Sequence, residues 1–260
     1  MTSEDLAAQA ERLGEPQPVW RTLTIVIPVY NERETVMTTL RKVLLQDTAP
    51  LAKEVVMVDD GSTDGTREIL QSVEWEGLCR ELCRNPDDSV RLLLHAGNRG
   101  KGACVKSALA EARGEVVLIQ DADLEYDPAD YPALLAPILS GRADAVFGNR
   151  FHAGAHRVPR FYRYLLNRLF SLLCNLLTCI AVNDVTAGYK VLRRDLLDAL
   201  QMESNRFSME TELTVKLART PARIYEVPIV YYGRTYAEGK KIRWMDGLAA
   251  TYHLFRYRFF

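Results

Sequence analysis

The stretch Glu115-Val-Val-Leu-Ile-Gln-Asp-Ala-Asp123 is the most informative part of the sequence. Its apolar centre is a short run rich in β-branched residues, which is typical of a strand buried on both faces. Asp121 and Asp123 end the stretch, and Glu125 comes two residues later. Carboxylates that share one site repel one another unless a cation lies between them, and hard divalent cations prefer oxygen ligands. The stretch therefore favours a metal site at a strand exit, although the same acids could also begin a turn before Pro128.

Apolar runs and helical patterns alternate on both sides of this stretch. The expected strands are 23–28, 54–58, 90–94, 115–120, 143–147 and 223–232, and the expected helices are 34–46, 66–73, 102–112, 130–140 and 210–219. This alternation predicts an α/β fold with a mainly parallel sheet and helices on both faces. In such sheets ligands bind at the carboxyl ends of the strands, so the residues just after each strand should carry the chemistry.

Three further strand ends carry polar or glycine-rich motifs. They are Pro28-Val-Tyr-Asn-Glu32, Asp59-Asp-Gly-Ser-Thr-Asp-Gly65 and Asn98-Arg-Gly-Lys-Gly102. Taken singly, each of the first two could be an ordinary turn. The third opens an expected helix, and its glycines and lysine are suited to receive an anion on backbone N–H groups. It lacks the spacing of a Walker A loop, and no GxGxxG follows the first strand.

In this order and at successive strand ends, these motifs and Asp121-Ala-Asp123 resemble family 2 glycosyltransferases of the GT-A fold, over roughly Leu23 to Asp246. The resemblance implies an enzyme that binds a nucleotide-sugar donor together with Mg2+ or Mn2+. It assigns the donor to Pro28, Tyr30, Glu32, Asp60, Lys101, Asp121, Ala122 and Asp123. It assigns the metal to Asp121, Asp123 and Glu125, where the ion would neutralise charge that develops on the departing nucleoside diphosphate.

Later segments resemble the subgroup whose acceptor is a polyprenyl phosphate, such as dolichyl or undecaprenyl phosphate. The matching segments are Gly148-Asn-Arg-Phe151, Asp184-Val-Thr-Ala-Gly-Tyr-Lys190 and Glu226-Val-Pro-Ile229. The resemblance implies that the acceptor phosphate is bound by Arg150, Arg163, Asp184, Lys190 and Arg234. Arg150 is the strongest candidate, because a planar guanidinium can hold two phosphate oxygens at once. The sequence departs from the subgroup in two ways: residues 157–167 lack a serine, and Glu125 stands where glutamine is frequent.

The nature of the acceptor decides whether a base is needed. A phosphate monoester is already mostly anionic at neutral pH and needs none. On that reading the enzyme transfers a hexose from GDP-mannose or UDP-glucose with inversion. The candidate catalytic residues are Asp123, Arg150 and Glu210. A soluble sugar or glycan hydroxyl would need a base, and Glu210 is the candidate, although the helix dipole alone favours a glutamate there. A third alternative is a regulator that binds nucleotide sugars without turnover.

Composition and cysteine usage indicate the compartment. The chain has 260 residues, is 48% hydrophobic and 26% charged, and can bury one large core. Its 5 cysteines form no CxxC pair, which argues against a disulfide framework. The first residues do not resemble a signal peptide, and the apolar stretch Leu169 to Val182 is too short to span a bilayer. We expect a cytoplasmic protein that binds peripherally to the cytoplasmic face of a membrane.

Charge divides the chain into two halves. Residues 1–149 carry 15 Lys+Arg against 25 Asp+Glu, whereas residues 150–260 carry 18 against 9. Either the basic half meets phosphate or anionic lipid, or the halves are differently solvated faces. The apolar helix 165–182 and the basic aromatic segment 243–260 suit a bilayer surface. Packing on the core or on another subunit would explain both patterns as well.

These patterns predict a domain organisation. A helical extension over 1–21 precedes a GT-A catalytic domain over 22–236, and a basic aromatic segment with amphipathic helices follows over 237–260. Within the catalytic domain, 22–149 is the nucleotide-sugar-binding half and 150–236 is the acceptor half with interfacial helices. No nucleic-acid partner is expected, and the sequence leaves both a homodimer and a membrane partner subunit open.

Overall fold

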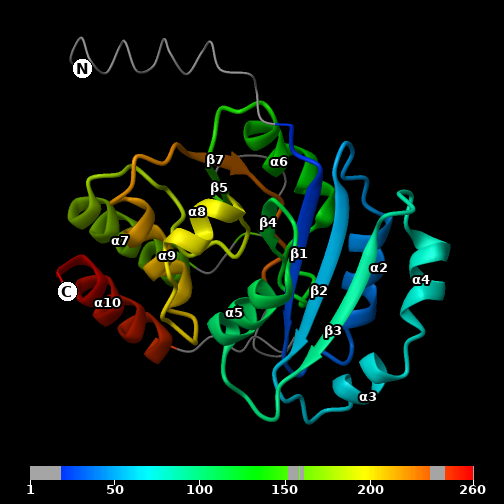
Figure 1. Ribbon diagram of the computed structural model, residues 1–260. Helices are drawn as coiled ribbons and strands as arrows, with labels where there is room; N and C mark the ends of the chain where they lie inside the picture. The colour runs from blue at the N-terminus through cyan, green and yellow to red at the C-terminus, as the bar shows by residue number, and fades with distance from the viewer. Residues whose placement is uncertain (1–18, 152–157, 159–160, 235–243, 260) are drawn as a thin grey trace.

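The structure, a computed structural model, describes residues 19–151, 158, 161–234 and 244–259. The strands are β1 Thr22–Val29, β2 Ala52–Asp59, β3 Ser89–Leu94, β4 Val116–Ile119, β5 Ala145–Asn149, β6 Lys190–Arg193 and β7 Ile224–Pro228. They form a seven-stranded sheet in the order β3-β2-β1-β4-β6-β5-β7 (Figure 1). β6 runs antiparallel to β4 and β5, whereas the other pairs are parallel. The mainly parallel sheet expected from the sequence is confirmed.

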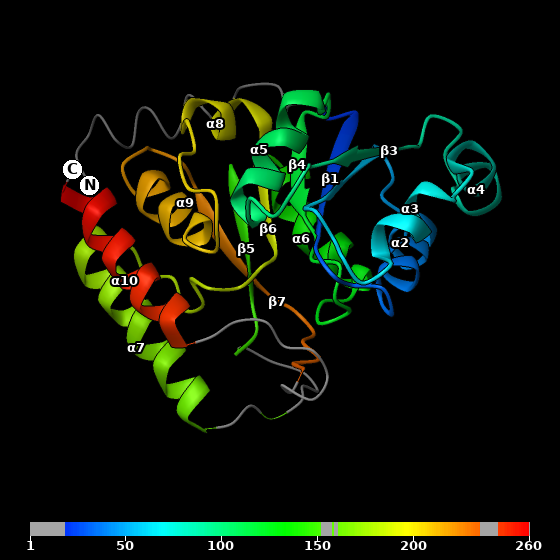
Figure 2. The same ribbon diagram turned by 90° about the horizontal axis from the view of Figure 1, so that it is seen from below.

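Helices cover both faces of this sheet, as expected (Figure 2). They are α2 Val36–Leu45, α3 Thr66–Gln71, α4 Trp75–Leu82, α5 Lys101–Glu111, α6 Tyr131–Leu139, α7 Phe161–Thr178, α8 Arg194–Ala199, α9 Met209–Leu217 and α10 Trp244–Phe259, with a 3-10 turn at Pro128–Asp130 before α6. One core lies between the sheet and α2, α3, α4 and α6. A second core lies between the opposite face and α5, α7, α8, α9 and α10.

The central strands are mostly apolar because both of their faces are covered. All residues of β4 are buried. In β1, Ile25 and Ile27 point into the first core, while Val26 points into the second. Full burial of one such side chain contributes about 1.5–3 kcal/mol, so these strands hold the two layers of helices together. Their continuous apolar pattern is the one that a parallel sheet between helices requires.

The antiparallel strand β6 was not expected from the sequence. Its first residue, Lys190, pairs with Ile119 of β4 and with Phe147 of β5. Because β6 runs in the opposite direction, the residues that precede it lie at the edge where β4 and β5 end. The segment 184–189 is thereby brought to the same edge of the sheet as Asp121 and Arg150.

Some expected boundaries differ from the structure. The apolar helix expected over 165–182 is α7, which begins at Phe161 and ends at Thr178, because Cys179 adopts a left-handed backbone conformation with φ 60°. α4 and α8 were not expected. Residues 1–18 and 235–243, on which the expected N-terminal helix and part of the C-terminal segment fall, lie outside the described residues. Within the described chain, every helix is too short or too polar to cross a membrane.

Candidate active site

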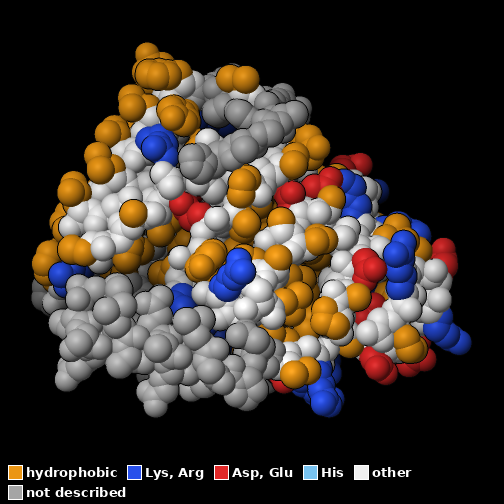
Figure 3. Space-filling view, turned by 90° about the horizontal axis from the view of Figure 1, so that it is seen from above, with side chains coloured by type: hydrophobic (Ala, Val, Ile, Leu, Met, Phe, Trp, Pro, Cys, Tyr) orange, Lys and Arg blue, Asp and Glu red, His pale blue; other side chains and the backbone are white. Residues whose placement is uncertain are grey.

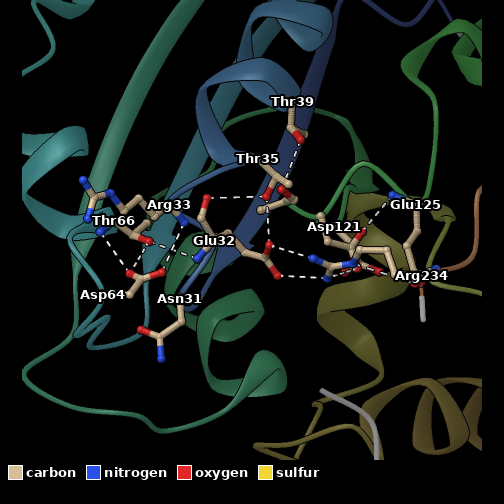
Figure 4. A network of polar contacts seen from close by, with 12 residues as sticks. Asn31, Glu32, Arg33, Thr35, Thr39, Asp64, Thr66, Asp121, Glu125 and Arg234 are labelled. Carbon is tan, nitrogen blue, oxygen red and sulfur yellow. Dashed lines mark hydrogen bonds and ion pairs between the residues drawn. The ribbon is translucent and has the colours of Figure 1, made fainter. Parts of the chain in front are cut away.

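Two loops at the carboxyl ends of β1 and β2 are joined by hydrogen bonds (Figure 4). The Asn31 N–H donates to Ser62 Oγ at 2.9 Å, and the Thr63 N–H donates to Asn31 Oδ1 at 2.8 Å. The Glu32 N–H donates to Thr66 Oγ1 at 2.9 Å. Asn31 has φ 52°, a left-handed conformation that asparagine tolerates better than most residues. The first two motifs therefore form one unit, which sets the direction of the Glu32 side chain.

Asp121 stands at the exit of β4, between α5 and the segment before β6. Its Oδ1 lies 2.7 Å from Lys101 Nζ. A Cβ at position 188 would lie 2.3 Å from Asp121 Oδ2, so Gly188 allows the backbone to pass close to this carboxylate. The carbonyl of Ala122 accepts a hydrogen bond from Thr39 Oγ1 at 3.1 Å, which anchors the strand exit on α2.

Arg234, which follows β7, reaches acids that the sequence assigned to the donor and the metal (Figure 4). Its Nη2 lies 2.9 Å from Asp123 Oδ2 and 3.1 Å from Glu32 Oε1. Its backbone N–H donates to Glu125 Oε1 at 2.7 Å. The sequence led us to expect Arg234 at the acceptor phosphate, whereas the structure pairs it with residues expected for the donor and the metal. A guanidinium carries five donors and can serve several carboxylates at once, which fits this position.

Several acids at this edge of the sheet contact the same two cations among the described residues. The carboxylates of Glu32, Asp121, Asp123, Glu125 and Glu210 share Lys101 and Arg234 as ionic partners. Burial, reinforced by Asp121 and Glu125, raises the pKa of Asp123 to about 7, and Arg234 acts in the opposite direction. A divalent cation bound between carboxylates relieves this mutual repulsion. The residues present therefore fit the expected Mg2+ or Mn2+.

Lys101 and Glu210 connect this site to the second layer of helices. Lys101 is the first residue of α5, and its Nζ lies 2.9 Å from Glu210 Oε1 as well as near Asp121. Burial opposes the charge of Lys101, but Asp121 and Glu210 outweigh it and raise its pKa. Glu210 lies in the first turn of α9 and is buried. The ion pair with Lys101 was not expected for Glu210, whether it acts as a base or only as a glutamate at a helix start.

Asp60 is occupied by contacts within the chain. Its side chain is buried and accepts hydrogen bonds from the N–H groups of Arg99 at 2.9 Å and Gly100 at 2.7 Å. The anion that these N–H groups receive is therefore a carboxylate of the protein, which differs from the open anion site expected at Asn98-Arg-Gly-Lys-Gly102. The glycines serve packing instead: a Cβ at Gly100 would lie 2.4 Å from the carbonyl oxygen of Asn205.

Arg150 forms a buried ion pair at the end of β5. Its Nε and Nη2 donate to the two oxygens of Asp184 at 2.7 Å each, and Nη2 also donates to Thr186 Oγ1 at 2.7 Å. Burial opposes ionisation of Asp184, but Arg150 outweighs it and lowers the pKa of that carboxyl. The structure joins these two expected acceptor residues. Because a carboxylate repels phosphate, Asp184 serves to orient Arg150.

The other expected acceptor residues have different surroundings. Lys190 is fully buried, donates to the carbonyl oxygen of Ala187 at 2.6 Å, and burial lowers its pKa to about 8. Arg163 lies half-buried in the first turn of α7. One turn later, Asn167 Oδ1 accepts a hydrogen bond from Thr186 Oγ1 at 3.2 Å. Asn167 therefore reaches the surroundings of Arg150 in the segment that lacks the expected serine.

Two expected donor residues lie at the end of β1. Pro28 is half-buried within the strand, and Tyr30 follows it with 36% of its surface exposed. Aromatic rings at a strand end can stack on flat ligands, which is the role expected for Tyr30.

Sequence reasoning missed Tyr126 and Tyr231, which join the residues expected for the donor to those expected for the acceptor. Their ring centroids are 5.3 Å apart. Tyr231 donates from its hydroxyl to Glu125 Oε2 at 2.7 Å, and its ring lies 5.1 Å from the Arg150 guanidinium carbon. Tyr126 accepts a hydrogen bond from the Gly188 N–H at 2.8 Å. A single tyrosine near an acid is too common a pattern to have identified them.

Comparison with known proteins defines the class. The family model described as Glycosyl transferase family 2 matches residues 24–201, and the chain belongs to this family. It is 33% identical over 227 residues to an undecaprenyl-phosphate mannosyltransferase of Micrococcus luteus, covering 85% of this chain and 87% of the relative. It is 29% identical over 231 residues to a polyprenol monophosphomannose synthase of Mycolicibacterium smegmatis, covering 86% and 82%. The protein is a glycosyltransferase.

Solved structures agree on the fold. A glucosyl-3-phosphoglycerate synthase from Mycobacterium tuberculosis, in complex with Mn2+, uridine diphosphate and phosphoglyceric acid, superimposes with a TM-score of 0.65 at 19% identity, covering 94% of this chain and 84% of that one. A mannosyltransferase from Pyrobaculum calidifontis, in complex with GDP-Man and Mn2+, gives 0.54 at 22% identity, covering 88% and 63%. At these identities the likeness shows the fold, which is the expected GT-A fold.

Proposed function

We propose that the protein transfers a mannosyl residue, with inversion, from a nucleotide-activated mannose to the phosphate of a polyprenyl phosphate. The sequence left GDP-mannose and UDP-glucose open. The names of the two relatives from Micrococcus luteus and Mycolicibacterium smegmatis favour mannose as the sugar and a polyprenyl carrier as the acceptor.

One observation supports the proposal most directly: a fixed guanidinium and a cluster of acids lie at the same edge of the sheet, connected by Tyr231. Arg150 is held by Asp184 and Thr186. In the described part of the chain its Nη1 makes no hydrogen bond, so this nitrogen is available to an acceptor oxygen. A polyprenyl phosphate needs such a cation, whereas a neutral hydroxyl acceptor does not.

We assign the donor to the acids on the other side of Tyr231 from Arg150. Asp121 and Asp123 would hold Mg2+ or Mn2+, with Glu125 beside them. When bound, the ion would neutralise charge on the nucleoside diphosphate as the bond to the sugar breaks. Lys101 and Arg234 add fixed positive charge next to these aspartates.

The chemical step needs no strong base. A phosphate oxygen of the acceptor, which is already anionic, forms a bond to the anomeric carbon while the bond from that carbon to the diphosphate oxygen breaks. The product is a β-linked polyprenyl phosphate sugar. Glu210 Oε1 forms an ion pair with Lys101 Nζ at 2.9 Å, and protonation of Glu210 would break that ion pair. This contact argues against Glu210 as the base of the hydroxyl-acceptor alternative.

An apolar ridge on α7 supports attachment to a membrane surface. Tyr162, Leu166, Leu169 and Leu176 are spaced by three, four or seven residues and are 77%, 64%, 52% and 70% exposed. Figure 3 shows apolar side chains gathered along the left edge of the molecule, the side on which α7 and α10 lie in Figure 1. An exposed apolar surface of this kind marks a binding surface. The acceptor is itself a lipid, so we assign this ridge to the cytoplasmic face of a membrane.

The test is transfer of label into lipid. The purified protein is incubated with Mn2+, vesicles that contain undecaprenyl phosphate, and radiolabelled GDP-mannose or UDP-glucose. We expect organic-extractable label from GDP-mannose, loss of that label in Asp123→Asn, and full labelling in Arg142→Ala, an exposed arginine of the opposite sheet edge. Transfer of label to soluble sugars instead of lipid, or no lipid product from any nucleotide sugar, would contradict the proposal.

A further inference from the structure

A buried histidine outside the contacts described so far lies directly after β3. His95 is 8% exposed, and both of its ring nitrogens are engaged. Nδ1 lies 2.7 Å from Asp60 Oδ1, and Nε2 lies 2.9 Å from Ser107 Oγ. An ionised carboxylate can only accept, so Nδ1 carries the proton, and the Ser107 hydroxyl can donate to Nε2. Since Ser107 belongs to α5, the imidazole connects this helix to the end of β2.

Asp60, which contacts His95, also binds the residues just before α5. Its Oδ1 and Oδ2 accept the N–H groups of Arg99 and Gly100, the two residues that precede the helix. The N–H groups at a helix start have no partner within the helix, and a carboxylate there is stabilising. Asp60 thereby fixes where α5 begins, and Lys101 is its first residue.

The position of the start of α5 determines where the Lys101 side chain lies. Its Nζ lies 2.7 Å from Asp121 Oδ1 and 2.9 Å from Glu210 Oε1, and 9% of the side chain is exposed. We propose that His95 is a positioning residue of the donor site: it fixes Asp60, which fixes the start of α5 and so holds Lys101 against Asp121. This inference rests on the proposed function, because Lys101 and Asp121 are assigned there to the donor diphosphate and its metal.

The same region offers a competing explanation. Ligand atoms of Asp60, His95 and Cys104 all lie within 4.8 Å of one another, a spacing that could also hold a metal ion. Both oxygens of Asp60 already accept backbone N–H groups, which favours the hydrogen-bonded arrangement. Elemental analysis of the purified protein separates the two: a stoichiometric metal that Cys104→Ser releases would overturn the positioning role.

Two substitutions at His95 separate its two hydrogen bonds. The amide nitrogen of asparagine can reach the place of Nδ1, and that of glutamine can reach the place of Nε2. His95→Asn therefore keeps a donor for Asp60, whereas His95→Gln keeps only the bond to Ser107. His253→Gln is the matched control, because it removes a half-buried imidazole from α10 that stacks on Tyr257.

The measurement is calorimetric binding of GDP and of UDP in the presence of Mn2+. We expect His95→Gln to weaken binding of the nucleotide by on the order of tenfold, the usual effect of losing a hydrogen bond to a charged group. His95→Asn should stay close to the native protein, and His253→Gln should match it. In a Lys101→Met background, His95→Gln should add no further loss, since it acts through Lys101.

Amide hydrogen exchange tests the same idea without nucleotide. His95→Gln should speed exchange in a peptide covering residues 96–103 while the rest of the sheet stays protected, which general destabilisation would not produce. Equal losses of nucleotide binding in the Asn and Gln variants, or additive losses with Lys101→Met, would overturn the positioning role. A native protein that binds neither nucleotide with Mn2+ would instead overturn the proposed function, and this role with it.

Discussion

Removing the ammonium of Lys101 should destabilise the protein measurably. In Lys101→Met, an apolar side chain of similar length replaces the cation that lies 2.7 Å from Asp121 Oδ1 and 2.9 Å from Glu210 Oε1. Breaking a buried pair by removing one partner costs about 3–5 kcal/mol, because it leaves charge buried without compensation. Asp121 is 23% exposed, so water screens part of this cost and the lower end, about 3 kcal/mol, applies.

Thermal unfolding followed by circular dichroism, without divalent cations, measures this cost. For a chain of this size 1 kcal/mol corresponds to roughly 2–4 °C, so the expected decrease in Tm is about 6–12 °C. The double variant Lys101→Met with Glu210→Gln removes one of the two uncompensated charges and should recover part of that decrease. Added Mn2+ should raise the Tm of Lys101→Met more than that of the native protein, because the ion supplies the missing positive charge.

Lys106→Met provides the control from the same helix. Its ammonium donates to the carbonyl oxygen of Glu203 at an exposed position, so its loss should change stability by less than about 0.5 kcal/mol. If Lys101→Met melts with the native protein, or if Glu210→Gln restores nothing, then the two carboxylates do not depend on Lys101 and the reasoning about this site is wrong.

Three further outcomes follow from the geometry. Arg150→Lys keeps the charge but not the fork of donors on Asp184, so in lipid-transfer kinetics the KM for the polyprenyl phosphate should rise about tenfold while the KM for the donor stays unchanged. Burial lowers the pKa of Lys190 from 10.5 to about 8, so between these values the unfolded chain binds more protons and the native protein gains stability as pH rises. Urea unfolding should therefore give a flatter stability profile over this pH range for Lys190→Met, and an equally steep one would contradict the assignment. Leu166→Glu places a charge on the exposed ridge of α7 and should reduce sedimentation with anionic vesicles, whereas unchanged sedimentation would remove the ridge from the membrane surface.

The sequence by itself determined the parallel strands of the sheet and the edge at which their polar ends meet. Strands such as β1 and β4 were found because a strand covered on both faces must be apolar along its whole length, and that pattern is local. Their polar exits were found for the same reason: Glu32 and Asp121 each follow a run of apolar residues directly. Parallel strands bring such exits to one edge, so their proximity followed from the topology alone.

The tertiary structure alone decided which of these residues are partners. Arg234 and Glu32 are 202 positions apart, and their pairing depends on how the chain returns after β7. The segment 184–189, which we expected at the acceptor, reaches the site because β6 is antiparallel. The four residues Lys190–Arg193 do not reveal the direction of this strand by themselves. The resemblance placed Asp60 at the donor nucleotide, and only the structure shows that it also accepts the N–H groups before α5. The physical reason is the same in each case. Burial of a strand or helix shows in the pattern of residues that are neighbours in the sequence, whereas strand direction and polar partners depend on contacts between distant segments.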